Sequence, residues 1–531
     1  MKRIKFVLPV FLLMLLTIVS CKKSILDLEN MNEPGPQSLE TEEGMKRMSL
    51  GIYSKFGLDY WWLTLGYHDI MGDSYFISAG NFSWRWANQT AKITLSNGTI
   101  LTPPQGGTQG VELKARNDRS FGDDNAFSNE WESCYAVNNQ ANVLLDAVKS
   151  PALKIINDAD LKKKVISAWA YWWKGFAYSR LGSMYVSGVI TDEPGKTNSN
   201  YVLNTALIAE ANKNFDLAIA ELQGITDVST YANFLQGFLP DFVDEYGTKG
   251  NGSTLTPAAW IRNMNTYKAR NLLVNKTVAQ MTTADWTTIK TLATNGIQPT
   301  DQIFTTRSAN DNDLVSLSAW APARLLISGW EYVSERLVQD FKTGDARRTR
   351  NIVNAPGGTV VNRSGRGFQY GTRWAFKPIE SGGDYASTLA GLAVIPIACS
   401  FEENELMLAE ANIKLGLVDL GLASIDKVRA FQNAALPAVT GTGLNPAQAY
   451  EELRRERRIG LINKNVSFYD ARRWGVINAG VGRTGAVVVG PGGVIDNNAT
   501  IDYNYLSYWD VPKNELDFNS PSNPAVPVAT N

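Results

Sequence analysis

Apolar residues recur at helical spacing along most of the chain. In one segment Met45, Met48, Ile52 and Phe56 follow one another at steps of three or four positions, which places them on one face of a helix. Stripes of the same kind predict further helices at residues 158–181, 204–222, 265–281, 401–415, 417–431, 446–463 and 468–478. Strand-like alternation is rare and local. The pattern therefore predicts a mainly α protein.

The helix predicted at residues 158–181 has an unusually wide apolar face. Trp169, Trp172 and Trp173 widen it, so we expect this helix to be buried on most sides. Trp131 lies on a similar helical stripe. All four tryptophans are therefore expected in the core.

The helices follow one another in pairs. The tetrapeptide AEAN occurs at residues 209–212 and again at 409–412, and residues 178–185 fit tetratricopeptide spacing with tyrosine in place of tryptophan. Paired helices of this length predict a helical-repeat scaffold over residues of about 125–290 and 400–480.

Two long insertions interrupt the predicted repeats. Residues 58–128 and 295–400 are rich in Gly, Asn, Thr, Ser and aromatic residues, and we expect irregular loops that carry the binding function. No low-complexity linker divides the chain, so residues 21–531 are predicted to form one domain. The proline-containing tail from Asn519 is expected to be mobile or draped over the surface.

The N-terminus resembles a bacterial lipoprotein signal. Lys2, Arg3 and Lys5 precede an apolar run over residues 6–19, and this run is shorter than a membrane-spanning helix requires. The small Ser20 stands directly before Cys21, so residues 1–20 are predicted to be removed and Cys21 to be lipidated. The alternative is an ordinary signal peptide in which the cysteine is incidental. Acyl chains on Cys21 would anchor the protein to a membrane without spanning it.

The composition argues against several classes of function. The chain has 51 basic and 52 acidic residues, whereas nucleic-acid-binding proteins are normally basic. His68 is the only histidine, so a zinc site or a Ser-His-Asp triad is a poor prediction, and we expect neither a metal nor a cofactor. We expect His68 to be a hydrogen-bonding loop residue, and Cys134 and Cys399 to be buried thiols. Glycoside hydrolysis needs a pair of carboxylates without fixed sequence spacing, so this enzyme class stays open.

Aromatic residues are concentrated in the first insertion, where residues 61–86 contain eight of them. The apolar faces of sugars lie flat on aromatic rings, while neighbouring polar groups bind the hydroxyls. This pattern predicts a ligand-binding site that includes Asp73, Tyr75, Trp84, Arg85 and Trp86. The alternative is that the rings belong to the core, because Phe82, Trp84 and Trp86 would share one face of a strand.

Six arginines stand in residues 451–475, EELRRERRIGLINKNVSFYDARRWG. Glu451 and Glu452 precede Arg454 and Arg455 at helical spacing, and Asp470 and Trp474 follow on the next predicted helix. Arginine pairs with carboxylates in bidentate geometry and stacks on aromatic rings. We therefore interpret these arginines as fasteners between two helices and not as a ligand site.

The order ELRRERRIGL followed by FYDARRWG resembles the C-terminal part of the SusD/RagB family of Bacteroidetes outer-membrane lipoproteins. Residues 401–411, FEENELMLAEA, and residues 423–429 are similar to the two helices that precede this part in the family. Residues 168–189 and 508–518 resemble its aromatic helix and its closing segment. The chain departs from the family pattern at residues 466–467 and 187–190.

The resemblance implies a fold and a function. The implied fold is a right-handed scaffold of four tetratricopeptide-like helix pairs whose loops form the ligand site. The implied protein is a non-catalytic, lipid-anchored glycan-binding protein of the outer membrane that faces the cell surface. It would pass oligosaccharides to a SusC-like TonB-dependent transporter. Family members often contribute a stacking aromatic residue from the second insertion, which suggests Trp320 with Arg324.

Two alternatives to this function stay open. One branch of the family binds peptides, so a RagB-like peptide-uptake protein is the first. A glycoside hydrolase is the second. Nucleic acid is not an expected partner of any of the three.

Overall fold

The structure is a computed structural model. It describes residues 36–54, 61–78, 82–104, 107–239, 254–307, 331–362, 370–378, 381–385, 394–396 and 399–530.

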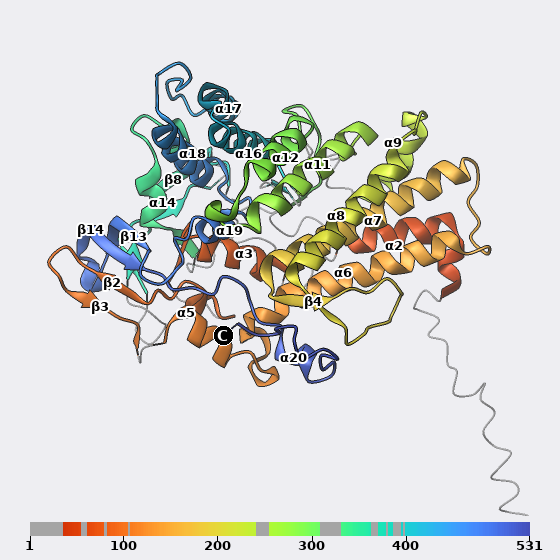
Figure 1. Cartoon of the computed structure of the whole chain (residues 1–531), viewed down its shortest axis with the longest axis horizontal. Coiled ribbons are helices and arrows are strands. Elements are labelled where there is room, and N and C mark those ends of the chain that lie inside the picture. Colours follow the sequence, from red (N-terminus) through yellow and green to blue (C-terminus); the bar gives the residue numbers. More distant parts are fainter. Residues whose placement is uncertain are drawn as a thin grey trace, which may run out of the picture.

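Eight long helices form the scaffold, and each packs against the next along the chain (Figure 1). They are α6 (Ala126–Lys149), α7 (Ala159–Met184), α8 (Asn204–Leu222), α11 (Pro257–Val274), α12 (Thr283–Thr294), α16 (Phe401–Lys414), α17 (Val418–Phe431) and α18 (Pro446–Gly460). This succession gives four helix pairs over the two ranges that the sequence predicted. The mainly α helical-repeat scaffold is therefore confirmed.

Further helices surround this scaffold in the described part of the chain. The α-helices are α2 (Glu42–Ser54), α3 (Trp61–Met71), α4 (Trp84–Ala87), α5 (Gln109–Ala115), α9 (Val228–Gln236), α14 (Glu335–Asp340), α15 (Ala346–Asn351), α19 (Ser467–Arg473) and α20 (Lys513–Leu516). Short 3-10 helices are η2 (Pro36–Glu40), η4 (Arg119–Asp124), η5 (Val278–Gln280) and η7 (Pro491–Gly493).

Helix α7 is buried along most of its length, as its wide apolar face predicted. Trp169, Trp172 and Trp173 have no exposed surface and contact one another edge to face, and Trp131 of α6 is also in the core. Apolar rings of this size contribute strongly to the stability of a core. The four tryptophans are thus packing residues, as predicted.

The helix predicted at residues 265–281 begins and ends earlier than expected. Helix α11 starts at Pro257 because the Thr256 hydroxyl accepts a hydrogen bond from the backbone N–H of Ala259, and proline fits the first helical position. It ends at Val274, and a capping box between Thr277 and Gln280 starts η5.

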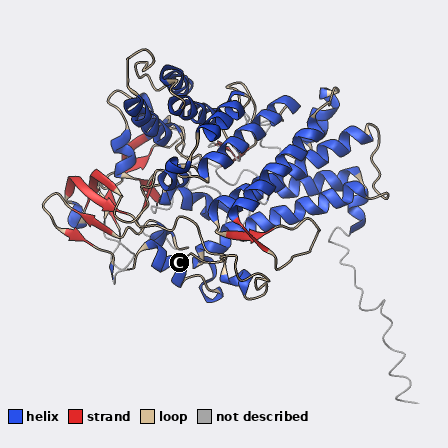
Figure 2. Ribbon diagram, viewed as in Figure 1, coloured by secondary structure: helices blue, strands red, loops and turns tan. Residues whose placement is uncertain are grey.

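The two insertions are more ordered than the expected irregular loops. They contribute most strands of two antiparallel sheets, whose orders are β1-β7-β11-β8 and β3-β2-β14-β13-β10-β9. Figure 2 shows these strands at the opposite end of the molecule from α7. Sheet formation was missed because the strands are short and their partners lie far away in sequence; Tyr75, for example, pairs with Val333.

The bounds of the strands follow. They are β1 (Tyr75–Ile77), β2 (Lys92–Thr94), β3 (Ile100–Leu101), β4 (Ser187–Val189), β5 (Tyr201–Leu203), β6 (Thr305–Arg307), β7 (Glu331–Val333), β8 (Ile352–Asn354), β9 (Val360–Val361), β10 (Gly371–Thr372), β11 (Trp374–Phe376), β12 (Val394–Pro396), β13 (Arg483–Val489) and β14 (Ile495–Asp502). Strands β4 and β5 pair with each other, as do β6 and β12.

The C-terminal tail is draped over the surface, which was one of its two expected states. The backbone N–H of Ser522 donates to Ser199 at 2.8 Å, and that of Val511 donates to Val528 at 2.7 Å. The Lys114 ammonium donates to the carbonyl of Thr530 at 2.6 Å. These bonds hold the tail against the body of the protein.

His68 lies on helix α3 and not on a loop, which corrects the expectation. Its imidazole is fully buried, with Nε2 at 3.3 Å from Glu130 and 3.2 Å from Arg180. Burial lowers the pKa of His68 below its ordinary value. His68 is thus a hydrogen-bonding residue, as expected, but it lies on a helix in the core.

Cys134 and Cys399 are buried free thiols, as predicted. Burial raises the pKa of both well above the ordinary value, so neither is a reactive thiolate. None of the helices in the described part of the chain combines the length and apolar character that crossing a bilayer requires.

Candidate functional site

Asp73 lies in a buried hydrogen-bond network. Its carboxylate accepts hydrogen bonds from Arg336 at 2.7 and 3.0 Å, and from the hydroxyls of Ser334 and Tyr503 at 2.8 Å each. Burial raises the pKa of Asp73, but the charge and hydrogen bonds of Arg336 outweigh this effect and hold the pKa well below its ordinary value. Both carboxylate oxygens thus accept hydrogen bonds from other residues of the protein.

Tyr75 and Trp84 also belong to the core. The Tyr75 hydroxyl donates to Asn463, and its ring meets Phe376 edge to face. Trp84 is 1% exposed, and its ring lies so close to Gly66 that a Cβ there would be 2.8 Å from it. For Asp73, Tyr75 and Trp84 the structure therefore favours the packing role over the predicted ligand contact.

The segment around Trp84 is helical and not a strand. Phe82 and Ser83 adopt left-handed backbone conformations with φ of 58° and 61°, and α4 begins directly after them. The Ser83 backbone N–H donates to Asp124 at 2.8 Å and holds this turn. Residues two apart on a helix point to different sides, so Trp84 and Trp86 do not share a face.

Trp86 reaches the surface, in contrast to Trp84. Its half-buried ring lies 4.7 Å from the Arg85 guanidinium and 4.2 Å from that of Arg116. Arg116 also lies 5.9 Å from the ring of Phe121, which is 42% exposed. Two guanidinium groups and two aromatic rings thus gather at this partly exposed surface.

Arg116 and Phe121 were missed by the sequence reasoning. The signal for Arg116 was its helical spacing from Glu112, with which it forms an ion pair, but such a pair usually marks a solvated helix face. Nothing in the sequence indicated that Phe121 would meet the same guanidinium.

A hollow of about 420 Å³ lies beside Trp374, and we call it the Trp374 pocket. It is lined by Glu335, Val338, Gln339, Phe341, Lys342, Thr343, Gly344, Asp345, Arg348, Thr349, Arg373, Trp374 and Val487. These residues come from α14, α15 and their connection, from β11 with its preceding residue, and from β13.

The Trp374 ring is held in place at its edge. Its Nε1–H donates to Glu335 at 3.0 Å, and the same carboxylate receives two hydrogen bonds from the Arg373 guanidinium, at 2.9 and 2.8 Å. Arg348 lies 5.1 Å from the ring, and Arg348 and Thr349 are exposed. A fixed, partly exposed ring with exposed polar neighbours is suited to binding a sugar.

Three predicted residues lie outside the part of the chain that the structure describes. They are Cys21, the expected lipidation site, and the expected ligand contacts Trp320 and Arg324.

The arginines of residues 451–475 pair largely as predicted. Arg454 pairs with Glu451 at 3.1 Å and lies 5.0 Å from the Trp474 ring. Asp470 accepts hydrogen bonds from both Arg457 and Arg473 in the buried contact between α18 and α19. The interpretation as fasteners between helices is confirmed for Arg457 and Arg473. Glu452 pairs with Arg429 and Lys342 and not with Arg455 as predicted.

Comparison with known proteins places this fold. No family model and no curated protein match the chain. A SusD-like carbohydrate-binding protein from Bacteroides fragilis matches with a TM-score of 0.56 at 15% identity, over 92% of this chain and 100% of that one. A SusD homologue from Bacteroides thetaiotaomicron matches with a TM-score of 0.56 at 12% identity, over 93% and 99%.

A third solved structure agrees with these two. It is a SusD-like carbohydrate-binding protein from Bacteroides vulgatus, with a TM-score of 0.50 at 14% identity over 92% of this chain and 95% of that one. The matches cover nearly the whole length of both partners, so they concern the complete architecture and not one repeat. The protein therefore has the SusD-like fold that the motifs in its sequence predicted.

Proposed function

We propose that this protein captures glycans without chemically changing them, as part of a nutrient-uptake system. The observation that carries the proposal is the Trp374 pocket in a SusD-like fold. The solved structures with this fold include proteins described as carbohydrate-binding. The pocket offers what a sugar requires, namely a fixed ring face with exposed polar groups around it.

In the proposed complex one sugar unit lies against the Trp374 ring. Its hydroxyls bind to Arg348 and Thr349, which are two of the exposed polar residues of the pocket. The Glu335 carboxylate is occupied by Arg373 and Trp374, so its role is to orient the ring. Such binding needs no bond to be broken.

The residues predicted from the sequence offer further candidate contacts. Trp86 and Arg85 form a second aromatic and cationic surface, and we propose that Trp320 and Arg324 also belong to the ligand-binding insertions. A chain of several sugar units could contact more than one ring, which would increase affinity by multiple weak contacts.

The binding protein is proposed to act at the outer membrane. Lipidation of Cys21 would anchor it on the cell surface, where it would pass oligosaccharides to a SusC-like TonB-dependent transporter. Replacement of Cys21 by alanine should move the protein from the membrane fraction to the soluble fraction. Affinity purification of the intact lipoprotein from its host membrane should bring down a TonB-dependent transporter.

Isothermal titration against a panel of neutral oligosaccharides tests the glycan proposal. We expect binding by the parent protein, and at least about tenfold weaker binding by Trp374→Ala, because loss of a stacking ring costs on the order of 1.4 kcal/mol or more. Trp374→Phe should retain part of the affinity because it keeps an aromatic face. Replacement of the exposed Arg47, which lies on α2, is the matched control and should change nothing.

The other outcomes separate the alternatives. If peptides bind and no glycan does, the uptake role stands with a different ligand class. If bound glycans release new reducing ends, the protein is a glycoside hydrolase and the non-catalytic proposal is wrong. If neither class of ligand binds, the proposed function is wrong.

A further inference from the structure

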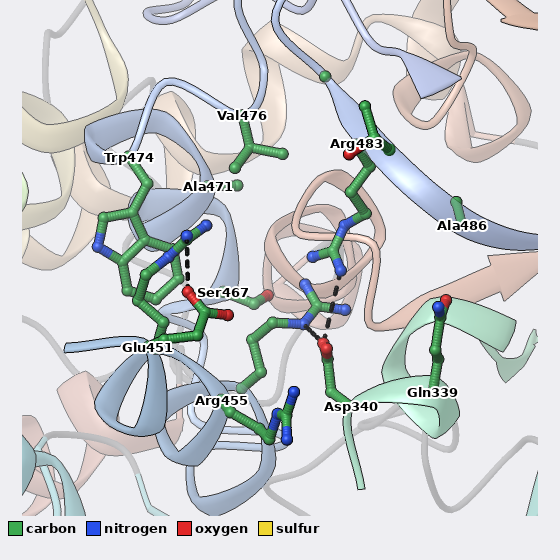
Figure 3. A pocket seen from close by; sticks show the side chains of 14 residues that line it. Gln339, Asp340, Glu451, Arg455, Ser467, Ala471, Trp474, Val476, Arg483 and Ala486 are labelled. Atoms are coloured by element: carbon green, nitrogen blue, oxygen red, sulfur yellow. Dashed lines mark hydrogen bonds and ion pairs between the residues drawn. The ribbon is translucent and has the colours of Figure 1, made fainter. Parts of the chain in front are cut away.

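A second hollow of about 350 Å³ lies next to the Trp374 pocket, and Gln339 lines both. We call it the arginine pocket. Figure 3 shows Trp474 on one wall, with Arg483 and Asp340 on the opposite wall. The lining residues are Gln339, Asp340, Glu451, Arg454, Arg455, Arg458, Ser467, Ala471, Trp474, Val476, Gly482, Arg483, Thr484 and Ala486.

Positive charge in the arginine pocket exceeds negative charge. Four lining residues are arginines and two are carboxylates. Glu451 is paired with Arg454 at 3.1 Å. Asp340 is shared by Arg458 at 2.5 Å and Arg483 at 3.5 Å. One carboxylate therefore serves two guanidinium groups.

Arg455 adds a further positive charge. It has no ion-pair partner among the residues that the structure describes, and its side chain is only half-buried at the pocket wall. It stands one position from Arg454, which is already paired with Glu451. Its guanidinium is thus free to donate to a molecule in the pocket.

The hydrogen bonds of the pocket are also incomplete. The Nε–H groups of Arg454 and Arg483 are shielded from solvent and have no acceptor in the described part of the chain. A buried donor without an acceptor is unfavourable, and an oxygen-bearing ligand would supply the missing acceptor. The two donors belong to α18 and β13, which form different sides of the pocket.

Burial lowers the pKa of Arg458, and the nearby charge of Arg483 lowers it further. Asp340 and Asp73 act in the opposite direction, but their effect is smaller. The local environment of Arg458 is therefore short of negative charge.

The neighbouring carboxylates Asp73 and Asp470 do not neutralise this positive charge, because each is already paired with other arginines. Asp73 is bound to Arg336. Asp470 accepts from Arg457 and Arg473 in the contact between α18 and α19.

Asp69 is only partly ionised near neutral pH. Burial raises its pKa to about 7, and the hydrogen bond from the Ser467 hydroxyl acts in the opposite direction. It contacts the pocket only through that lining residue.

We propose that the arginine pocket is a binding site for an oxyanion, namely the carboxylate, sulfate or phosphate group of a small ligand. Guanidinium groups donate to such groups through paired N–H bonds. Arg455 and Arg483 supply the donors, and the partly exposed Trp474 ring forms a wall against which the rest of a ligand packs. The site is separate from the proposed neutral-sugar contact at Trp374.

The direct test uses sulfate and its heavier analogue selenate. Isothermal titration with sodium sulfate is compared with sodium chloride at equal ionic strength, and crystals are soaked in selenate to locate it by anomalous scattering. We expect saturable sulfate binding and a selenate peak between Arg455 and Arg483. The proposal would be overturned if sodium chloride gave the same saturable signal as sodium sulfate. It would also be overturned if selenate bound only outside the arginine pocket.

Substitutions make the test specific. Arg455→Gln should weaken sulfate binding about tenfold or more, since it removes a charge-assisted donor that has no structural partner. Asp340→Asn removes the shared carboxylate and should strengthen binding. Arg47→Gln is the matched control, because that arginine is 78% exposed on another helix and should leave binding unchanged. Equal affinity for all three variants and the parent would refute the site.

Two further titrations, with glucuronate and with phosphate, identify the kind of molecule that carries the oxyanion. Tighter binding of glucuronate than of sulfate would indicate an acidic sugar, whereas sulfate or phosphate binding without glucuronate binding would indicate an inorganic or esterified anion. Sulfate binding should persist in Trp374→Ala, and neutral-glycan binding should persist in Arg455→Gln. The two proposals can therefore fail independently.

Discussion

Asp470 lies at the centre of a buried ion network, and its removal should be costly. Its carboxylate accepts from Arg457 at 2.8 Å and from Arg473 at 2.7 Å, while Arg473 also binds Glu410 of α16 at 2.6 and 2.7 Å. The four side chains are at most 3% exposed. Two arginines and two carboxylates thus balance inside the contact of three helices.

The substitution Asp470→Ala leaves this balance one negative charge short. Breaking a buried ion pair by removing one partner typically costs about 3–5 kcal/mol, because the remaining charge is desolvated without compensation. The unfolding entropy of about 2.1 cal/mol/K per residue amounts to about 1 kcal/mol/K for a chain of this size. We therefore expect the melting temperature to fall by about 3–5 °C.

The pH dependence of this effect has a definite sign. Burial raises the pKa of Asp470, but Arg457 and Arg473 lower it by more, so the folded value lies below the unfolded one. Its stabilising contribution is then fully present above about pH 4 and is lost as the pH falls through the lower folded value. The difference between parent and variant should accordingly shrink in strong acid.

Differential scanning calorimetry at neutral pH measures the effect, with Glu451→Ala as the matched control. Glu451 is 61% exposed and pairs with a partly exposed Arg454, so its loss should cost less than about 1 kcal/mol. If both variants melt within 1 °C of the parent, the reasoning that this network fastens the helices is refuted.

Three other substitutions test the fold in the same assay. Burial raises the pKa of Asp69 to about 7, so the folded protein keeps a proton that the unfolded chain releases above about pH 4. The free energy of unfolding should therefore decrease as the pH rises from about 4 to 7. Asp69→Asn should flatten this slope and be more stable than the parent at pH 8 by up to about 4 kcal/mol; an unchanged slope would contradict the assignment. At the contact of α7 and α8, a Cβ on Gly175 would lie 2.6 Å from the Phe215 ring, so Gly175→Ala should destabilise by about 1–3 kcal/mol. Gly51→Ala, at an open helical position, should stabilise by about 0.5–1 kcal/mol, and equal effects of the two would refute the packing argument.

The helices could be predicted from the sequence because their periodicity is local. Residues 204–222 match α8 at both ends, and residues 401–415 match α16 within one position. Helix α11 was placed wrongly because its start is set by the pair Thr256 and Pro257, which precede the apolar stripe. Attention to the capping residues would have found it.

The sheets could not be predicted in the same way. Strands β1 and β7 have three residues each and come from different insertions, and β14 near the C-terminus pairs with β2. A strand of three residues carries too little alternation to be recognised. Its existence depends on a partner that the local sequence does not contain.

The exposure of single residues in the candidate site could not be predicted either, for the same reason. The sequence singled out the aromatic segment, but whether one of its rings is buried depends on whether the segment is a strand or a helix. In helix α4 the side chain of Trp84 is buried, and that of Trp86 is half-exposed between two arginines. Nothing in the local sequence marks Trp374 as a ligand contact, since its partner Glu335 and the exposed Arg348 lie in segments whose positions the sequence does not reveal.

The arginine-rich segment has two separate roles because a helix has more than one face. Arg457 points into the contact with α19, where Asp470 neutralises it. Arg454, Arg455 and Arg458 line the pocket instead, and their excess charge arises because Arg483 joins them from β13. The sequence motif alone could therefore predict the fastener but not the pocket. A change on the inner face should affect stability first, whereas a change on the outer face should affect anion binding first.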